Sequence, residues 1–162
     1  MPYIILTVAL VALDQLVKFL VLKNIAPGAH VPFIPHILEL TYVENTGAAF
    51  SLFEEHTWIL ALISLVMSLI LAAALWKNFF RHPVGKVTLT LLLAGAVGNL
   101  IDRVFRGYVV DMFNVLFMNF AVFNVADIFV VISFIGIAVS ILFIYKDDEF
   151  EFLSIRKKES KA

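Results

Sequence analysis

Four stretches of mostly apolar residues constrain this chain more than any other feature. They cover residues 2–22, 58–76, 84–101 and 128–145, and each is long enough to cross the ~30 Å hydrocarbon core of a bilayer as a helix. Apolar residues make up 62% of the 162-residue chain, well above the roughly 45–50% of soluble domains. One small core cannot bury that much apolar surface, so the sequence predicts an α-helical membrane protein with four transmembrane helices.

The distribution of basic residues predicts how the helices are oriented. We expect the first stretch to be a retained helix and not a cleaved signal peptide, since it has no basic start and contains Asp14 and Lys18. Eight of the twelve Lys and Arg residues lie between the second and third stretches or after the fourth: Lys77, Arg81, Lys86, Lys146, Arg156, Lys157, Lys158 and Lys161. Because basic loops stay cytoplasmic, both termini are predicted inside and residues 23–57 and 102–127 outside.

The two outer segments have the composition of short strands. HILELTYVENTGAAFSLF (residues 36–53) and YVVDMFNVLFMNFAVFN (residues 108–124) are rich in β-branched and aromatic residues. Both are apolar enough to rest on the membrane surface. We expect residues 1–146 to form one four-helix domain and residues 147–162 to form a charged cytoplasmic tail.

Several classes of chemistry are missing from the sequence. A net charge of -1 without a basic patch excludes a nucleic-acid partner, and the absence of cysteine excludes thiol catalysis. The four histidines match no metal-binding spacing, and there is no nucleophile elbow or phosphate-binding loop. We therefore expect no metal and no cofactor, which leaves acid–base chemistry by carboxylates or ion transport.

Ionisable residues inside a membrane segment are functional candidates, because each costs about 2.5–3.5 kcal/mol near a helix centre. Asp14 and Lys18 are four residues apart and share a helix face. They form either a self-neutralised pair that reaches outward or a pair in which Asp14 braces a polar cluster between helices.

The segment GAVGNLIDR combines small and polar residues at helical spacing. Ala94 and Gly98 form a small-xxx-small pair that allows close helix packing. A packing contact with a polar end accounts for the glycines, whereas a hydrogen-bonded scaffold or substrate-positioning role fits the polar residues better. The residues on this face are Gly95, Asn99, Asp102 and Arg103.

Two more aspartates lie in apolar surroundings. Asp127 opens the fourth stretch, where the helix dipole alone would explain a carboxylate, and Asn124 precedes it by three residues as a hydrogen-bonding neighbour. Asp111, within VVDMF, has no such explanation. If the two meet in space, their pKa values are pushed apart, so that one ionises and takes a proton from water while the other keeps its proton.

Five sequence elements carry a specific resemblance. In chain order they are DQLVK at 14–18, NTGAAF at 45–50, GAVGNLIDR at 95–103, VVDMF at 109–113 and FNVAD at 123–127. With these elements the chain resembles the lipoprotein signal peptidases (signal peptidase II), bacterial membrane aspartyl peptidases. The resemblance extends from the first helix through the fourth and leaves out the charged tail. One departure is Ile128, where many members are expected to have a small or hydroxylated residue.

The resemblance implies a fold, a site and a substrate. It implies four helices with a small extracytoplasmic β-sheet cradle, and a catalytic dyad of Asp111 and Asp127. The implied substrate is a prolipoprotein whose cysteine carries diacylglycerol, cleaved just before that cysteine at the outer face of the cell membrane. Separately from the resemblance, we expect the chain to act as a monomer and to contact membrane lipid. The implied supporting residues are Asp14, Lys18, Asn45, Gly95, Asn99, Asp102, Arg103 and Asn124.

Two other classes of function remain open on the residues alone. A small proton-coupled transporter would use the aspartates as a relay, although transporters place such groups near the midplane of repeated, broken helices. A noncatalytic membrane adaptor would bind a partner on its outer surface and leave the pairing of Asp111 and Asp127 a coincidence.

Overall fold

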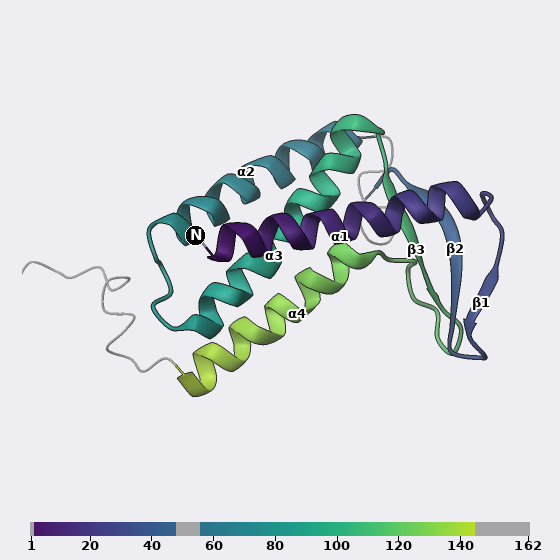
Figure 1. Cartoon of the computed structure of the whole chain (residues 1–162). Coiled ribbons are helices and arrows are strands. Elements are labelled where there is room, and N and C mark those ends of the chain that lie inside the picture. The colour runs from purple at the N-terminus through teal and green to yellow at the C-terminus, as the bar shows by residue number, and fades with distance from the viewer. Residues whose placement is uncertain (1, 48–55, 145–162) are drawn as a thin grey trace, which may run out of the picture.

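The computed structural model describes residues 2–47 and 56–144. Four helices lie side by side, and a small sheet covers one end of the bundle (Figure 1). All four helices are long and apolar enough to cross a membrane. In chain order the elements are α1 (Pro2–Asn24), β1 (Val31–Ile34), β2 (Leu38–Asn45), α2 (Thr57–Trp76), α3 (Pro83–Phe105), β3 (Val109–Val115), α4 (Val125–Val139) and a π-helical continuation of α4, η2 (Ser140–Ile144).

The predicted architecture is confirmed, with two corrected boundaries. The third helix does not stop at Ile101 but continues to Phe105, and the fourth begins at Val125 instead of Ile128. Polar residues lower the mean hydropathy of a segment, so a prediction from hydropathy ends the helix before them. Here the helices include these residues, because their side chains have partners on neighbouring elements. Asp102 and Arg103 therefore belong to the end of α3, and Asp127 lies inside the first turn of α4.

Helix α3 is the centre of the bundle and packs against α1, α2 and α4. Glycine permits this close packing. A Cβ atom at Gly95 would lie 2.6 Å from the carbonyl oxygen of Ala126 on α4, and one at Gly98 would lie 2.6 Å from Oδ2 of Asp14 on α1. The glycines of GAVGNLIDR thus bring α1 and α4 against the polar end of α3.

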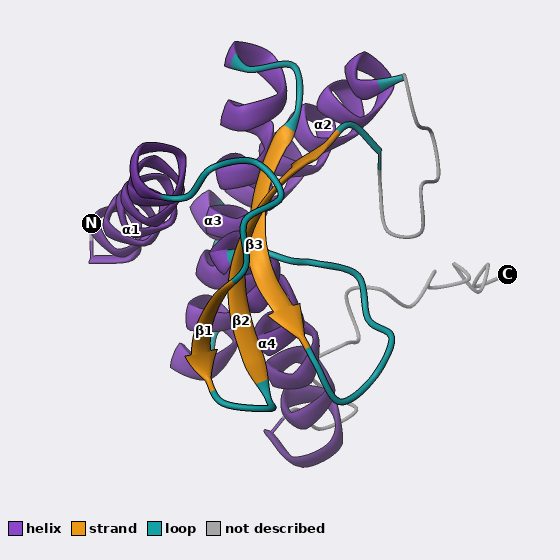
Figure 2. Ribbon diagram, turned by 90° about the vertical axis from the view of Figure 1, so that its right-hand side faces the viewer, coloured by secondary structure: helices purple, strands orange, loops and turns teal. Residues whose placement is uncertain are grey.

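The sheet is antiparallel in the order β1-β2-β3, and its strands run across the ends of the helices (Figure 2). Strands β2 and β3 confirm the prediction that the outer segments form short strands. Strand β1 was not predicted, because it lies before the segment 36–53. Its Pro32 has no backbone N–H to donate to a ladder, which suits an edge strand. Val43 lies opposite Asp111 after an irregularity in the β2 register.

The two faces of the sheet have different roles. Val21 from the end of α1 packs with Tyr42, Val110 and Met112 on one face. Because side chains alternate along a strand, Asp111 faces the other side of the sheet.

A short backbone link fixes where α4 begins. Phe123 pairs with Phe113 on β3, with N–H to carbonyl distances of 2.8 and 3.2 Å. The chain therefore returns to β3 immediately before Asn124. This return places the start of α4 beside Asp111.

Candidate active site

Asp111 lies on β3 with its side chain only 1% exposed. Its Oδ2 accepts a hydrogen bond from Asn45 Nδ2 at 2.8 Å, and its Oδ1 accepts one from Asn124 Nδ2 at 2.6 Å. Burial raises the pKa of Asp111 to about 6, against the lowering effect of the Asn45 hydrogen bond, and the Asp127 carboxylate raises it as well. Burial thus holds the pKa of this carboxyl group above the usual range for aspartate.

Asp127 is half-buried in the first turn of α4. Its Oδ2 accepts from the backbone N–H of Asn124 at 3.1 Å, and its own backbone N–H donates to Asn124 Oδ1 at 3.0 Å. These reciprocal bonds form a capping box at the helix start. The other oxygen, Oδ1, accepts from Asn99 Nδ2 on α3 at 2.8 Å. The carboxylate therefore caps the helix with one oxygen and contacts α3 with the other.

Asn124 joins the two aspartates. It is completely buried, and its Nδ2 donates both to Asp111 and, at 3.2 Å, to Asn99 Oδ1. Its backbone N–H and side-chain oxygen are the two groups that hold Asp127. Residues 16 positions apart in sequence are thus brought together through one side chain, as the dyad prediction requires.

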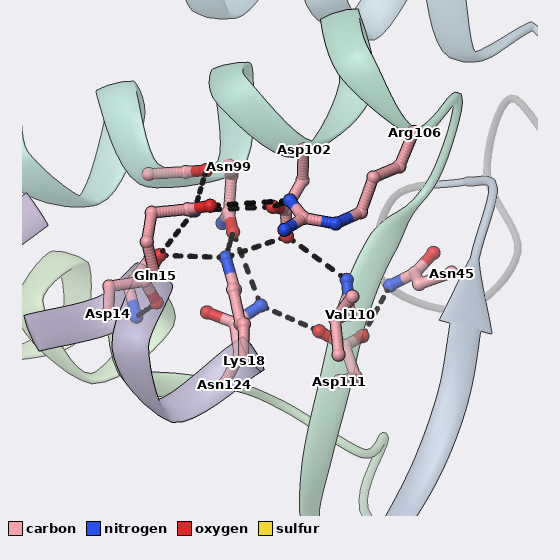
Figure 3. Close-up of polar contacts among 12 residues, drawn as sticks. Asp14, Gln15, Lys18, Asn45, Asn99, Asp102, Arg106, Val110, Asp111 and Asn124 are labelled. Atoms are coloured by element: carbon pink, nitrogen blue, oxygen red, sulfur yellow. Dashed lines mark hydrogen bonds and ion pairs between the residues drawn. The ribbon is translucent and has the colours of Figure 1, made fainter. Parts of the chain in front are cut away.

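A buried ionic cluster of Asp14, Lys18 and Asp102 lies next to Asp111 and Asn124 (Figure 3). Lys18 Nζ lies 2.9 Å from Asp14 Oδ2 and 2.9 Å from Asp102 Oδ2, and all three side chains are 0% exposed. Lys18 also donates to Asn99 Oδ1 at 3.0 Å. The outward-reaching interpretation of the Asp14–Lys18 pair is therefore wrong, and the interpretation as a brace between helices is confirmed.

The carboxylates of this cluster also hold the backbone around the site. Asp14 Oδ1 accepts from the N–H of Ala126 at 2.9 Å, just before Asp127. Asp102 Oδ2 accepts from the N–H of Val110 at 3.1 Å, just before Asp111. Each aspartate of the candidate dyad therefore follows a backbone group that the cluster fixes.

Two members of the cluster were not predicted from the sequence. Gln15 Nε2 donates to Asp102 Oδ1 and to the carbonyl oxygen of Gly98, each at 3.2 Å. Arg106 forms an ion pair with Asp102 and donates to Gln15 Oε1 at 3.2 Å. The available signals were the place of Gln15 beside Asp14 and the spacing of four residues between Asp102 and Arg106.

A cavity of about 770 Å³ opens beside the two aspartates. Its polar side combines carboxylates, carboxamides and a guanidinium: Asn45, Asn99, Arg103, Asp111, Asn124 and Asp127. Its apolar wall is contributed by strands, the β3–α4 connection and α4: Val43, Val109, Phe120, Val122, Phe123, Ile128, Val131 and Ile132. Ile128, the departure from the expected pattern, is one of these wall residues.

Arg103 lines the cavity, and not all of its guanidinium N–H groups are hydrogen-bonded within the described residues. Its Nη2 donates to the carbonyl oxygen of Gly47 at 3.3 Å. Its buried Nε has no hydrogen-bond partner within residues 2–47 and 56–144. The rest of the NTGAAF element, residues 48–50, lies outside the described residues.

Comparison with known proteins decides the family. A model of the family "Signal peptidase (SPase) II" matches residues 6–143. The chain belongs to the signal peptidase II family. A lipoprotein signal peptidase of Enterococcus faecalis is 43% identical over 88% of this chain and 86% of its own length. One of Lactiplantibacillus plantarum is 40% identical over 92% and 97%.

Solved structures agree with this assignment. A bacterial membrane enzyme determined by the in meso method at 2.3 Å superposes with a TM-score of 0.81 and 29% identity, over 98% of this chain and 93% of that one. A second such structure, at 1.9 Å, gives a TM-score of 0.80 and 30% identity over 89% and 94%. The signal peptidase II resemblance drawn from the five sequence elements is confirmed, and the chain is an aspartic peptidase of a bacterial membrane. The transporter and adaptor alternatives are wrong.

Within a signal peptidase, the geometry has a direct chemical meaning. Peptide hydrolysis needs one group that takes a proton from water and one that polarises the scissile carbonyl. Two carboxyl groups in unequal surroundings, one buried and one at a helix start, can provide both. The residues predicted from the sequence all lie in or directly behind this arrangement.

Proposed function

We propose that this signal peptidase removes the signal peptide from prolipoproteins with Asp111 and Asp127 as its catalytic pair. The observation that carries the proposal is the meeting of both carboxylates at one cavity, joined through Asn124. Two carboxyl groups so arranged can activate a water molecule and polarise a peptide carbonyl without a metal ion.

The supporting residues act by holding these groups and the substrate. Asn45, Asn99 and Asn124 each donate to a catalytic carboxylate. Lys18, Asp14 and Asp102 fix Asn99 and the backbone next to each aspartate, and Gly95 allows α4 to approach. Arg103, whose Nε has no hydrogen-bond partner in the described part of the chain, would bind a backbone carbonyl of the substrate.

The cavity suits a lipid-modified substrate. Its wall continues onto α4 through Val131 and Ile132, which are 57% and 48% exposed on the lipid-facing surface. A peptide with a diacylglyceryl cysteine can therefore enter sideways from the bilayer, with its acyl chains against this wall. We propose that cleavage falls just before that cysteine.

The orientation and membrane contacts follow from charge and exposure. The basic α2–α3 connection lies at the opposite end of the bundle from the sheet (Figure 1), so the sheet end faces outward. At the sheet end, Phe33 and Phe117 are 59% and 69% exposed, and residues 116–126 carry no charge. This apolar surface continues the lipid-facing surface of the helices and rests on the outer leaflet. We propose that residues 1–146 act as a monomeric domain and that residues 147–162 form a cytoplasmic tail.

The test is cleavage of a diacylglyceryl-modified prolipoprotein by purified protein. Asp111→Asn and Asp127→Asn should each lower the cleavage rate by about 10²–10⁴-fold, the usual contribution of a general acid or base. Glu39→Gln, an acid-to-amide change on β2 away from the cavity, is the control and should cleave normally. The circular dichroism of all three variants should match that of the wild type. Normal cleavage by either aspartate variant excludes the dyad.

A further inference from the structure

We propose that Arg106 is a positioning residue of the catalytic pair: it balances the buried charge of Asp102, and through Asp102 it holds Asp111 and sets the charge around it. This role rests on the proposed function above. Arg106 belongs to none of the five sequence elements, because it lies between GAVGNLIDR and VVDMF. In the structure it is the C-cap of α3, and its backbone N–H donates to the carbonyl oxygen of Asp102 at 2.8 Å.

The side chain of Arg106 holds Asp102 in two ways. Its Nη1 forms an ion pair with Oδ1 of Asp102 and donates to Oε1 of Gln15 at 3.2 Å (Figure 3). With Oε1 of Gln15 turned toward Arg106, Nε2 of Gln15 donates to Asp102 and to Asp14, each at 3.2 Å. The arginine side chain is only 25% exposed and Asp102 is 0% exposed, so water screens this ion pair less than it screens a surface pair.

Arg106 also completes the charge balance of the buried cluster. Lys18 lies 2.9 Å from one oxygen of Asp14 and 2.9 Å from one oxygen of Asp102. Two buried carboxylates and one ammonium leave one negative charge without a cation, which is strongly unfavourable away from water. Arg106 supplies the second positive charge. The end of α3 suits a cation as well, because the helix dipole is negative there.

The balanced carboxylate reaches Asp111 through one peptide unit. Oδ2 of Asp102 accepts from the backbone N–H of Val110 at 3.1 Å, and Asp111 is the next residue of β3. The charges of the cluster reach Asp111 too. Burial raises the pKa of Asp111 to about 6, and the Lys18 ammonium is one of the groups that oppose this rise. Without the charge of Arg106 the cluster would carry a net negative charge, which raises the pKa of Asp111 further.

The other charged groups around Asp111 do not replace Arg106. They come from three elements: Lys18 on α1, Arg103 on α3 and Asp127 on α4. On the facing strand β2, Asn45 is neutral, and Glu44 accepts a hydrogen bond from a tyrosine hydroxyl. Arg103 acts on Asp127 and on Asp111 more strongly than on Asp102. The second cation of Asp102 is therefore Arg106.

The pH profile of kcat/KM, measured with the purified full chain and a synthetic diacylglyceryl-cysteine peptide, tests this role. Arg106→Gln keeps a polar side chain but leaves one negative charge in excess, so the profile should move to higher pH by roughly 0.5–1 unit. Asp102→Asn leaves one positive charge in excess and should move the profile to lower pH. The double variant restores the balance and should return the profile to that of the wild type. Arg106→Lys keeps the charge and should keep the wild-type profile.

The matched control is Arg81→Gln. Arg81 is exposed on the α2–α3 connection, at the opposite end of the bundle from the sheet (Figure 1), so its loss should leave the profile unchanged. A purely structural role for Arg106 predicts a lower rate at every pH without any movement of the profile, and that result overturns the proposal. A profile that moves as far in Arg106→Lys as in Arg106→Gln also overturns it.

The same variants keep the proposal testable if Arg106→Gln does not fold. The double variant has no excess charge, so it should fold, and its profile can be compared with that of Asp102→Asn alone. A shift to lower pH that the second substitution removes supports the proposal, and identical profiles overturn it. The dyad is tested separately, since normal cleavage by Asp111→Asn removes the dyad, whereas unmoved profiles with an inactive Asp111→Asn remove only the role of Arg106.

Discussion

Replacing Lys18 with methionine should strongly destabilise the protein. Lys18 Nζ has three acceptors at 2.9, 2.9 and 3.0 Å, and it is 0% exposed together with Asp14 and Asp102. Methionine fills a similar volume but provides no charge, so two buried carboxylates lose their shared cation. Breaking a buried ion pair in this way costs about 3–5 kcal/mol.

Thermal unfolding of purified protein in detergent measures this loss. At about 2–4 °C per kcal/mol for a chain of this size, the midpoint should fall by about 6–20 °C. Lys23→Met is the matched control, because Lys23 is exposed near the end of the same helix. It should unfold within about 1 °C of the wild type, since exposed substitutions change stability little.

A double variant tests the physical reason. Lys18→Met combined with Asp14→Asn removes one of the two carboxylates that the single variant leaves without their cation. The pair should therefore unfold at a higher temperature than Lys18→Met alone, a non-additive result expected for residues in one network. The reasoning is refuted if Lys18→Met unfolds like Lys23→Met, or if Asp14→Asn lowers the midpoint of the single variant further.

Three more predictions concern packing, pH and a hydroxyl group on β2. Gly95→Ala places a Cβ 2.6 Å from a backbone oxygen of α4, so it should lower the free energy of unfolding by about 1–3 kcal/mol and reduce cleavage. Gly136→Ala is the control: its Cβ meets only a threonine side chain, so it should lower the stability less in the same thermal melts. Because the folded-state pKa of Asp111 is raised to about 6 from 3.8, its contribution to stability is greatest below pH 4 and is lost as the pH rises through 6. Asp111→Asn should lack this loss in unfolding measured between pH 4 and 7. Tyr42→Phe removes a hydroxyl that donates to Glu44 at 2.6 Å, and it should cost about 0.5–1.5 kcal/mol in the same melts.

The sequence predicted the helices well because hydrophobic length is a local property. The four apolar stretches are sufficient to predict the number of helices. The same reasoning ended α3 four residues too early and began α4 three residues too late. Asp102 and Asp127 reduce the apolar signal there, but their partners come from α1, β3 and the N-cap Asn124. Contacts between distant segments are not visible in a hydropathy pattern.

The residues of the candidate site were predictable from the sequence, but the hydrogen bonds and ion pairs that join them were not. Asp111 and Asp127 stood out as carboxylates in apolar surroundings, and the five elements supplied the rest by resemblance. The Phe113–Phe123 pairing that brings them together depends on the β3–α4 connection folding back. Gln15 and Arg106 complete the ionic cluster through bonds across α1 and α3. Each had an ordinary explanation as an exposed polar residue of a helix, so neither could be selected from the sequence alone.

A crystal structure with a transition-state mimic would show whether Asp111 and Asp127 act on the same atoms of the substrate. A lipidated peptide in which the scissile carbonyl is replaced by a hydroxyl-bearing carbon imitates the tetrahedral intermediate. We expect this hydroxyl to lie within hydrogen-bond distance of one oxygen of Asp111 and one of Asp127. A hydroxyl that contacts only one of the two carboxylates, or a peptide bound outside the cavity, would contradict it.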